Sequence, residues 1–531
     1  MQLVAYGAQD VYLTGEPQIT FFKVVYRRHT NFSVEPIEQT FNGAADFGRT
    51  VTCNINRNGD LISAMYVVVN LRQHADDAEN VEWGYVRRLG HAVVESCKIE
   101  IGGSKIDEHY SDWLNVWYEL TKQVGHDRGY AKMVGDVPEL TAVAKSHPEY
   151  RMYVPLQFWF NRNNGLALPL IALQYHDVRL TLKFRDVAGC VNVRCGQSVP
   201  SDQLPRMDDA YLLIDYVYLD SEERKRFAQA QHEYLIEQLQ FTGSESIPSN
   251  SNKYRLNYNH PSKFLVWVPH LEKYARRTRW LAYASDGNWE RAKEDFAKRL
   301  WLALRVDASG NLDTGGDDSN EVNQPSDSSA NVVNTDAVAW QLRNKVEAQV
   351  IFADASDNAP ANEANVVLLR NDLNIEDYST SLDDLGFANG GLEFAESRCV
   401  QAQDHFNSGN NVDGTDNPCT SAKLQLNGHD RFTTRDGHYF NYVQTHRHFS
   451  NTPADGINVY SFALEPEKHQ PSGTCNFSRI DNTTLNVNMG RNNKNNGVIN
   501  GNNSNSVLNI YTVNYNVLRV MSGMAGVAYS N

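Results

Sequence analysis

The chain has 531 residues, and because a single hydrophobic core stops growing at about 250–300 residues, its length predicts two large domains. Hydrophobic residues make up 41% of the chain and charged residues 21%, a balance that excludes an intrinsically disordered protein. The formal net charge of −15 argues against a surface that binds nucleic acid throughout, since such binding depends on Lys and Arg. We expect no sequence-specific nucleic-acid partner.

The chain shows no targeting or membrane signal. Its first residues, MQLVAYGAQD, lack a basic region followed by an apolar run, and no apolar stretch approaches the roughly 18 residues of a bilayer span. We therefore expect a protein that is neither secreted through a cleavable signal nor embedded in a membrane. Seven cysteines dispersed along a long chain favour reduced thiols over a disulfide framework.

Short segments of alternating polarity predict a mainly β protein. In Val178–Arg185 four apolar side chains alternate with four polar ones, which is typical of a half-buried strand. The same pattern occurs in Cys97–Ile101 and Leu485–Met489, with Gly, Asn, Asp and Pro between such runs.

Helical patterns are few. They predict helices over Asp112–Thr121, Ser221–Gln229 and about Asn288–Leu304. The second helix lies near the middle of the chain, with Ser221 as its expected N-cap and two glutamates in its first turn. We interpret it as the connector between two domains.

An internal repeat supports this division. Ile37-Glu38-Gln39, followed by Phe41 and Gly43, recurs as Ile236-Glu237-Gln238 followed by Phe241 and Gly243, 199 residues later. Farther along, KIEIGG (98–103) recurs as KLQLNG (423–428), and a His-Tyr pair follows each copy. Because the order is the same in both halves, the repeat predicts two copies of one β unit.

The second copy carries an insertion. The second pair of matches is separated by 325 residues instead of 199, so about 126 extra residues lie between about 270 and 420. Residues 307–420 hold about 21 acidic and 4 basic residues and read as a long solvated loop, with apolar stretches at Trp340–Phe352 and Asn365–Leu373. We place this loop between the fourth and fifth strands of the second unit, on the outer side of any assembly.

Long stretches of the sequence resemble one protein family. They are YGAQDVYLTGEPQITFFK (6–23), VYRRHTNF (25–32), NGLALPLIALQYH (164–176), HEYLIEQLQFTGSE (232–245), QPSGTCNFSRID (470–481) and NYNVLRVMSGMAGVAY (514–529). They closely resemble major capsid proteins of nucleocytoplasmic large DNA viruses, nearest to the algal-virus branch. The matches bracket both halves of the chain, which makes them far more specific than a short motif.

The resemblance implies an all-β fold of two tandem eight-stranded jelly rolls, with a short helical connector and a large loop insertion in the second. We expect an N-terminal arm at 1–20, the first jelly roll at 21–220, a linker at 221–231 and the second jelly roll at 232–531. The implied protein is a structural component of the virion capsid, assembled in the host cytoplasm. Its implied partners are two further copies in a homotrimer, neighbouring pseudo-hexagonal capsomers, penton and minor capsid proteins, and an internal membrane that it does not span.

Candidate chemistry is sparse. Asp107 and Glu108 are adjacent carboxylates after the Gly102-Gly103 turn, and we interpret them as solvated turn residues because neighbours on a strand point in different directions. His446 and His448 would share one strand face, with His438 and His429 nearby, but no carboxylate or thiol completes a metal site. Cys190 and Cys195 are a single pair, which is weak evidence for a disulfide or zinc site. We expect no catalytic residue, cofactor or metal, since Walker and Gly-x-Ser-x-Gly motifs are also missing from the sequence.

Two surface features remain open. Lys23, Arg27 and Arg28, beside His29, form a basic cluster that is either a solvated strand edge or, as the resemblance implies, a patch facing the inside of the capsid. Glycosylation sequons occur at Asn31, Asn476, Asn482 and Asn502, and chance is an adequate explanation for them without a secretory signal.

Two other functions compete with the capsid interpretation. A carbohydrate-binding β-sandwich would also use jelly rolls and exposed aromatics, but it would not need the same ordered signatures in both halves. A minor capsid or penton protein of the same lineage generally carries one jelly roll, whereas this sequence predicts two.

Overall fold

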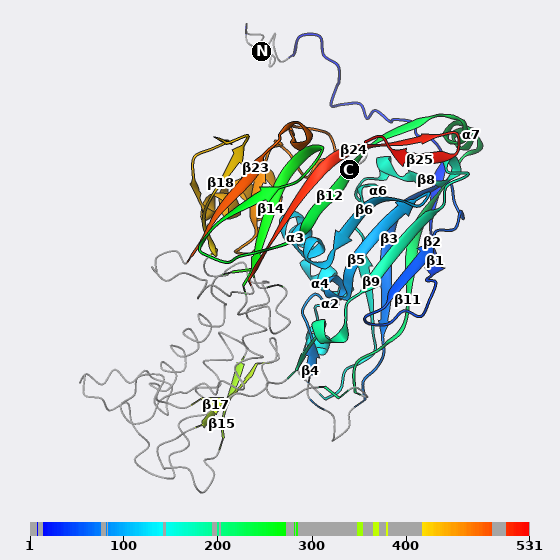
Figure 1. Cartoon of the computed structure of the whole chain (residues 1–531). Helices are drawn as coiled ribbons and strands as arrows, with labels where there is room; N and C mark the ends of the chain where they lie inside the picture. Colours follow the sequence, from blue (N-terminus) through cyan, green and yellow to red (C-terminus); the bar gives the residue numbers. More distant parts are fainter. Residues whose placement is uncertain are drawn as a thin grey trace, which may run out of the picture.

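The computed structural model describes residues 8, 14–75, 81, 83–141, 145–193, 199–200, 203–271, 281, 283–284, 348–353, 365–370, 379–380, 417–490 and 506–529. The predicted helix at Asn288–Leu304 lies outside these residues. Strands dominate the described chain, which confirms the all-β expectation (Figure 1).

The first half of the chain forms two four-stranded sheets. One has the order β1-β11-β3-β7 and the other the order β2-β9-β5-β6, with every neighbouring pair antiparallel. Their bounds are β1 Phe32–Thr40, β2 Thr50–Asn54, β3 Leu61–Leu71, β5 Val94–Ile101, β6 Ser104–Tyr110, β7 Tyr150–Pro155, β9 Val178–Phe184 and β11 Met207–Leu219. These eight strands form the first jelly roll.

The second half repeats this arrangement. Its sheets have the orders β12-β24-β14-β21 and β13-β23-β18-β19, again antiparallel. The bounds are β12 His232–Ser246, β13 Ser251–Leu256, β14 Pro261–His270, β18 Cys419–Leu426, β19 His429–Asp430, β21 Asn458–Ser461, β23 Thr483–Met489 and β24 Val507–Met521. These strands form the second jelly roll, and the predicted pair of eight-stranded rolls is confirmed. The exact domain bounds given above stay a prediction.

The sequence repeat falls on equivalent strands. Its first signature lies in β1 and β12, the first strand of each roll. Each copy ends in a glycine of positive φ, 105° at Gly43 just after β1 and 110° at Gly243 at the register shift within β12. Its second signature lies in β5 and β18, each followed by a tight turn of two positive-φ residues, Gly102-Gly103 and Asn427-Gly428. Such turns match the twist of an antiparallel hairpin, and glycine or asparagine adopts them at little cost.

Shorter elements complete the two rolls. Additional strands are β4 Trp83–Tyr85, β8 Leu168–Pro169, β10 Val191–Val193, β20 Arg435–Asp436, β22 Cys475–Asn476 and β25 Met524–Val527. The helices are α2 Leu89–Val93, α3 Ser111–Thr121, α4 Asp127–Met133, α5 Pro138–Thr141, α6 Trp159–Arg162, α7 Ser221–Gln229 and α12 Gln444–His448, with shorter helical turns at Asn164–Leu166, Leu170–Ala172, Val187–Gly189, Tyr439–Val443 and Phe477–Arg479.

Both tested helix predictions are confirmed, with one correction. Helix α3 covers the predicted Asp112–Thr121, and α7 covers Ser221–Gln229 between the two rolls. The N-cap of α7 is Asp220 instead of Ser221, and it makes no side-chain capping bond. Ser221 follows the extended backbone of Asp220 and is already helical, so the polar pattern placed the start one residue late.

Alternation along the strands builds the cores. Val178, Leu180, Leu182 and Phe184 of β9 are buried while the residues between them face outward, as predicted. In β23 the same is true of the apolar positions from Leu485 to Met489. Because one face of each sheet is apolar, the two sheets of a roll bury these faces against each other.

The two rolls point the same way, so the molecule has two distinct ends (Figure 1). The "arm end" carries residues 14–31, α7 and the turns at 102–103 and 427–428. The "insertion end" carries the last residue of β14, the first residue of β18 and the connection from β23 to β24. In the first roll, the connections from β6 to β7 and from β9 to β11 also begin and end at the insertion end, whereas the connection from β7 to β9 lies at the arm end.

The insertion follows the third strand of the second roll, which corrects the predicted position after the fourth. Strands β12, β13 and β14 precede it, and β18 follows it as the fourth. The two apolar stretches predicted to fold contain β15 Ala348–Ala353 and β16 Asn365–Arg370, which pair antiparallel, and β17 Ser379–Thr380 adds to β16.

Candidate functional site

The junction between the two rolls concentrates the buried polar chemistry of the described chain. Edge strand β6 of the first roll lies along edge strand β12 of the second. The Gln238 side chain donates to the carbonyl of Ile106, and the backbone amide of Leu239 donates to the Asp107 carboxylate at 3.0 Å. These two bonds fix the position of β12 along β6, and the contact covers an edge of each strand that would otherwise be open to pairing with another chain.

Glu237 of β12 is the centre of one ionic cluster at this junction. Its carboxylate pairs with Arg162 of the first roll at 2.9 Å and with Lys263 of β14 at 2.8 Å, and His469 lies 3.4 Å away. Burial alone would raise the pKa of Glu237, but Arg162, His469 and Lys263 together lower it to about 2. The ammonium of Lys263 also lies over the ring of Tyr515, 5.2 Å from its centroid. A buried carboxylate with this many cations stays ionised.

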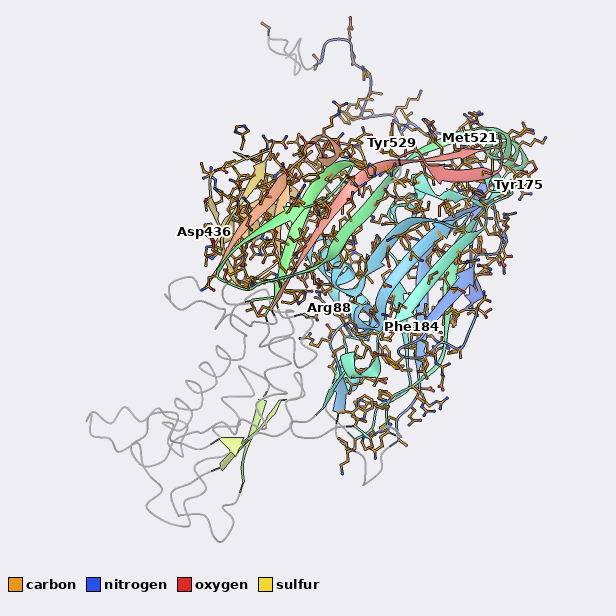
Figure 2. The ribbon with its side chains drawn as sticks, viewed as in Figure 1. Arg88, Tyr175, Phe184, Asp436, Met521 and Tyr529 are labelled. Atoms are coloured by element: carbon orange, nitrogen blue, oxygen red, sulfur yellow. The ribbon has the colours of Figure 1, made fainter. Side chains whose placement is uncertain are left out.

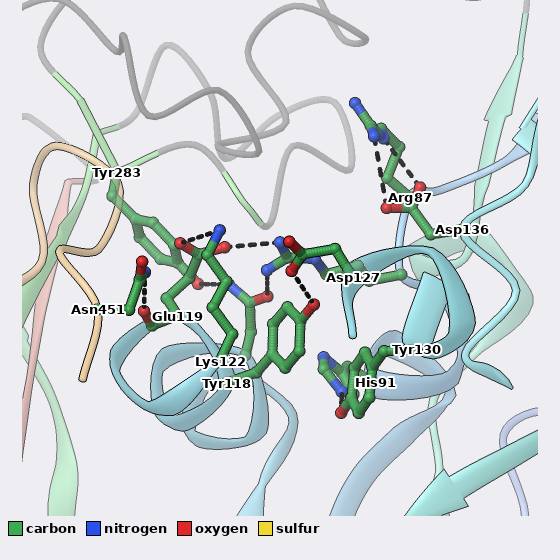
Figure 3. A network of polar contacts seen from close by, with 12 residues as sticks. Arg87, His91, Tyr118, Glu119, Lys122, Asp127, Tyr130, Asp136, Tyr283 and Asn451 are labelled. Atoms are coloured by element: carbon green, nitrogen blue, oxygen red, sulfur yellow. Dashed lines mark hydrogen bonds and ion pairs between the residues drawn. The ribbon is translucent and has the colours of Figure 1, made fainter. Parts of the chain in front are cut away.

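A second network surrounds α3 (Figure 3). The buried guanidinium of Arg88 pairs with Glu119 at 2.6 Å and lies 4.7 Å from the ring centroid of Tyr118, whose hydroxyl donates to Asp127. Arg88 has a φ of 50°, a left-handed conformation that is costly for a residue with a Cβ. The ion pair with Glu119, the Tyr118 ring and a hydrogen bond that the guanidinium donates to Asn115 hold it there.

Residues of the second roll complete the core of the first. Ile236, Leu518, Val520 and Ala525 are buried in the same apolar cluster as the residues of β3, β5 and β9. They come from β12, β24 and β25, which extend over the first roll at the arm end (Figure 1). We call the β24–β25 hairpin the "strap".

The strap is fastened to the first roll by hydrogen bonds. The amide of Tyr175 donates to the carbonyl of Gly523 at 2.9 Å, and the amide of Ala525 donates to the ring of His176 at 3.1 Å. Its tip exposes Met521 and Met524, and the Tyr175 ring beside it is 75% exposed (Figure 2). The strap therefore closes the core and also presents apolar side chains to the surroundings.

The predicted carboxylate pair is only partly as expected. Asp107 is not a solvated turn residue, since it lies in β6 with 3% exposure and pairs with His109 at 3.0 Å. Its burial comes from β12, which lies along β6 and could not be foreseen from local sequence. Glu108 is half-buried and pairs with Lys105. The two side chains diverge, so they do not form a paired acid and base.

The predicted histidine arrangement is wrong. His446 and His448 lie in helix α12, where positions two apart point to different sides, and His448 contacts the carbonyl of Leu464 at 2.9 Å. His438 pairs with Asp436, and His429 is exposed in β19. Within the described part of the chain, no group of three or more His, Cys, Asp or Glu is placed to hold a metal ion.

Of the predicted cysteine pair, only one member can be placed. Cys190 is buried in the first core, and burial raises the pKa of its thiol to about 12. Cys195 lies outside the described residues. A thiol in this environment is a packing residue with little nucleophilic character.

The basic cluster is fully exposed. Lys23, Arg27, Arg28 and His29 lie on an extended segment at the arm end, together with large apolar side chains. The apolar residues, exposed by 67–99%, are Ile19, Phe21, Phe22, Val24, Val25 and Tyr26. A segment that combines cations with uncovered aromatic and aliphatic groups is typical of a binding surface.

Three of the four sequons lie at the arm end. Asn31 precedes β1, Asn476 ends β22 beside the start of β14, and Asn482 contacts Asn427 in the β18–β19 turn. The side chain of Asn476 is half-buried and accepts a hydrogen bond from the amide of Ser478 at 3.0 Å. Asn502 lies outside the described residues, in the connection between β23 and β24.

Comparison with known families accounts for nearly the whole chain. A model described as major capsid protein N-terminus matches residues 20–220, and a model described as large eukaryotic DNA virus major capsid protein matches residues 223–526. The chain belongs to the family of large eukaryotic DNA virus major capsid proteins. It is 43% identical to capsid protein 1 of Acanthamoeba polyphaga mimivirus and 42% identical to the major capsid protein of Phaeocystis pouchetii virus, each over 100% of this chain and 99% of the relative.

Solved capsid proteins share the fold. The PBCV-1 capsid protein in a quasi-atomic model of that virus capsid superimposes with a TM-score of 0.63 at 32% identity, covering 96% of this chain and 100% of that one. The Faustovirus major capsid protein gives a TM-score of 0.59 at 12% identity over 97% and 94% of the two chains, a likeness of fold alone.

The capsid protein is thus a structural component of the virion of a large DNA virus, as the sequence resemblance implied. The carbohydrate-binding and minor-capsid alternatives find no support in these comparisons. No helix among the described residues is long and apolar enough to cross a bilayer.

The ionic cluster at the junction of the two rolls was not predicted from the sequence. Glu237 stood in the repeat but was given no role, and Arg162 and Lys263 were not singled out at all. The sequence signal for this cluster is a single lysine, Lys263, within the apolar strand β14. A lysine buried in such a strand requires a carboxylate nearby.

Proposed function

We propose that three copies of this capsid protein form a pseudo-hexagonal capsomer that tiles an icosahedral shell. The observation that carries this proposal is the pair of rolls with one strand order and one orientation, because a threefold assembly of such pairs presents six nearly equivalent sides. Self-association is already expected of a protein related to an assembled capsid.

Measuring the mass and shape of the purified protein tests this proposal. Light scattering coupled to size exclusion should give three times the chain mass of 60.0 kDa, and electron microscopy should show particles with a hexagonal outline. A stable monomer at micromolar concentration, or a ring of another order, would contradict it.

The charges at the two ends of the molecule suggest which end lies on the outside of the shell. We propose that the insertion end is outside and the arm end inside. The insertion carries most of the negative charge, and placing it inside would set it against DNA or anionic lipid within a range where salt screens only partly. Lys23, Arg27 and Arg28 at the opposite end suit an inner surface with minor capsid proteins and an internal membrane.

Limited proteolysis of intact particles distinguishes the two orientations. Cleavage within residues 307–416 and protection of residues 14–31 would support the proposal, and the reverse pattern would refute it. A chain that lacks residues 307–416, with β18 left intact, should still form capsomers because loop length costs little closure entropy.

Three further points stay proposals. Of the sequons, Asn31, Asn476 and Asn482 lie at the proposed inner end, so we propose that they carry no outer glycan, and glycopeptide mass spectrometry of virions tests this. Penton proteins are proposed as neighbours, and the host cytoplasm as the place of assembly. We also propose that the protein has no catalytic activity, since the family is a structural one.

A further inference from the structure

Helix α3 belongs to the first roll by sequence and packs into the second. Its apolar side chains Trp113, Val116, Trp117 and Leu120 are buried in one cluster with residues of β14, β21 and β24. The ring of Trp113 is stacked on that of Phe264, with 6.4 Å between centroids, and is tilted against that of Tyr511, with 5.5 Å between centroids. The helix thus covers the face of the β12-β24-β14-β21 sheet that points away from the second core.

The N-terminal turn of α3 carries a carboxylate, Asp112, whose side chain is only 13% exposed and is held by the second roll. Asp112 Oδ1 accepts the Tyr283 hydroxyl at 2.9 Å. Its Oδ2 accepts the Tyr511 hydroxyl at 2.9 Å, the Asn509 amide at 3.1 Å and His270 Nε2 at 3.3 Å. All four donors come from β14, β24 and the segment that follows β14.

This carboxylate stays charged in the folded protein. Burial by itself would raise its pKa, yet His270, Asn509 and Tyr511 lower it to about 2. A charge withdrawn from water is tolerated only where donors surround it, so the four donors of the second roll take the place of water around Asp112 while α3 is docked.

The C-terminal end of α3 is held by the same roll. Asn451 donates its side-chain amide to the carbonyl of Glu119 at 2.7 Å and its backbone amide to the carbonyl of Leu120 at 3.2 Å (Figure 3). These carbonyls belong to the last turn, where helix acceptors lack a partner within the helix. Both ends of one helix are therefore hydrogen-bonded to groups of the other roll, through the Asp112 side chain at the start and through backbone carbonyls in the last turn.

We infer that Asp112 is a positioning residue that locks the two jelly rolls at a single angle, by offering one carboxylate to four donors of the second roll. The lock does not depend on the capsomer proposal. Its consequence for tiling does, because a trimer can present six equivalent sides only if the angle within each chain is fixed.

The test compares Asp112→Asn with Glu222→Gln in the full chain. Both acids are the second residue of a helix, α3 and α7, so both changes remove the same interaction with a helix N-terminus. Glu222 is exposed and pairs only with Lys225 at 3.5 Å. Hydrogen exchange of the α3 amides should accelerate by about tenfold or more in Asp112→Asn and stay unchanged in Glu222→Gln.

The exchange pattern separates a lock from general stability. Amides of β11, in the middle of the first roll, should keep their protection in Asp112→Asn, whereas a global loss of stability would expose both segments alike. If Asp112→Asn fails to fold, Tyr511→Phe removes one donor and should give a smaller acceleration confined to α3. Exchange within about twofold of wild type in both variants, or equal acceleration in β11, overturns the inference.

Capsomer formation is a separate readout. Normal α3 exchange with a monomeric protein would refute the capsomer and leave the lock standing. Fast α3 exchange together with irregular particles would connect the two.

Discussion

The two copies of Ile-Glu-Gln occupy the same place in the two rolls and differ in their surroundings. In β1, Glu38 points to solvent, and the edge of the strand is open. In β12, Glu237 is buried against two cations and a histidine, because the first roll covers that edge. The repeat determines the strand and its register, while the chemistry of the same side chain depends on what packs against it.

The largest expected loss of stability comes from replacing the buried glutamate, Glu237. Glu237→Gln removes the carboxylate that pairs with the buried Lys263 and the half-buried Arg162, and we expect a loss of about 3–5 kcal/mol in unfolding free energy. Urea denaturation measures it. Glu38→Gln is the matched control and should stay within about 0.5 kcal/mol of wild type. A change in Glu237→Gln as small as that in Glu38→Gln would mean that the ion pairs of Glu237 add no net stability.

The strap gives the next largest effect. Leu518 belongs to the second half of the chain but is buried in the first core, so Leu518→Ala should cost about 3–4 kcal/mol. Denaturation followed by hydrogen exchange should show the loss in β3 and β9 of the first roll. A loss confined to the second roll would show that the strap does not stabilise its neighbour.

Acid should weaken the junction before the separate cores. Glu237 and Asp112 both have folded pKa values lowered to about 2, facing Arg162, Lys263 and His469 in one case and His270, Tyr283 and Tyr511 in the other. Lowered carboxyl pKa values give stability that is complete above the unfolded values near 4 and lost as pH falls toward 2, on the order of 2–3 kcal/mol for each group. Denaturation between pH 5 and pH 2 measures this slope. A flat profile in that range would contradict it.

The smallest effect concerns Asp107, whose contacts are hydrogen bonds and one histidine pair. Asp107→Asn should cost about 1–3 kcal/mol, because the amide of Leu239 keeps an acceptor while His109 loses its anion. Glu108→Gln, one residue along the same strand, is the half-exposed control. Thermal unfolding compares the stability of the two variants. An Asp107 variant as stable as its control would mean that the Asp107 contacts add no net stability.

The sequence predicted what depends on local periodicity. The alternation of apolar and polar residues correctly predicted which side chains of β9 and β23 are buried, because a strand carries its own pattern of period two. The repeat correctly identified β1 and β12, and β5 and β18, as equivalent strands of the two rolls. The sequence did not predict the helix that contains His446. It also did not predict Asp107 as buried, since its burial depends on β12, far along the chain. The same limit hid Asp112, a first-turn acid that looks like any exposed helix start until the second roll is in place.

The strap has a consequence for how the chain is made. Leu518 leaves the ribosome 299 residues after Leu219, the end of the last strand of the first roll. At a synthesis rate of about 5–20 residues per second, the first core therefore lacks its last apolar side chains for roughly 15–60 s after its own strands are made. Translation must be nearly finished before either roll is closed, so we expect nascent and truncated chains to be excluded from the growing shell and to depend on chaperones during that interval.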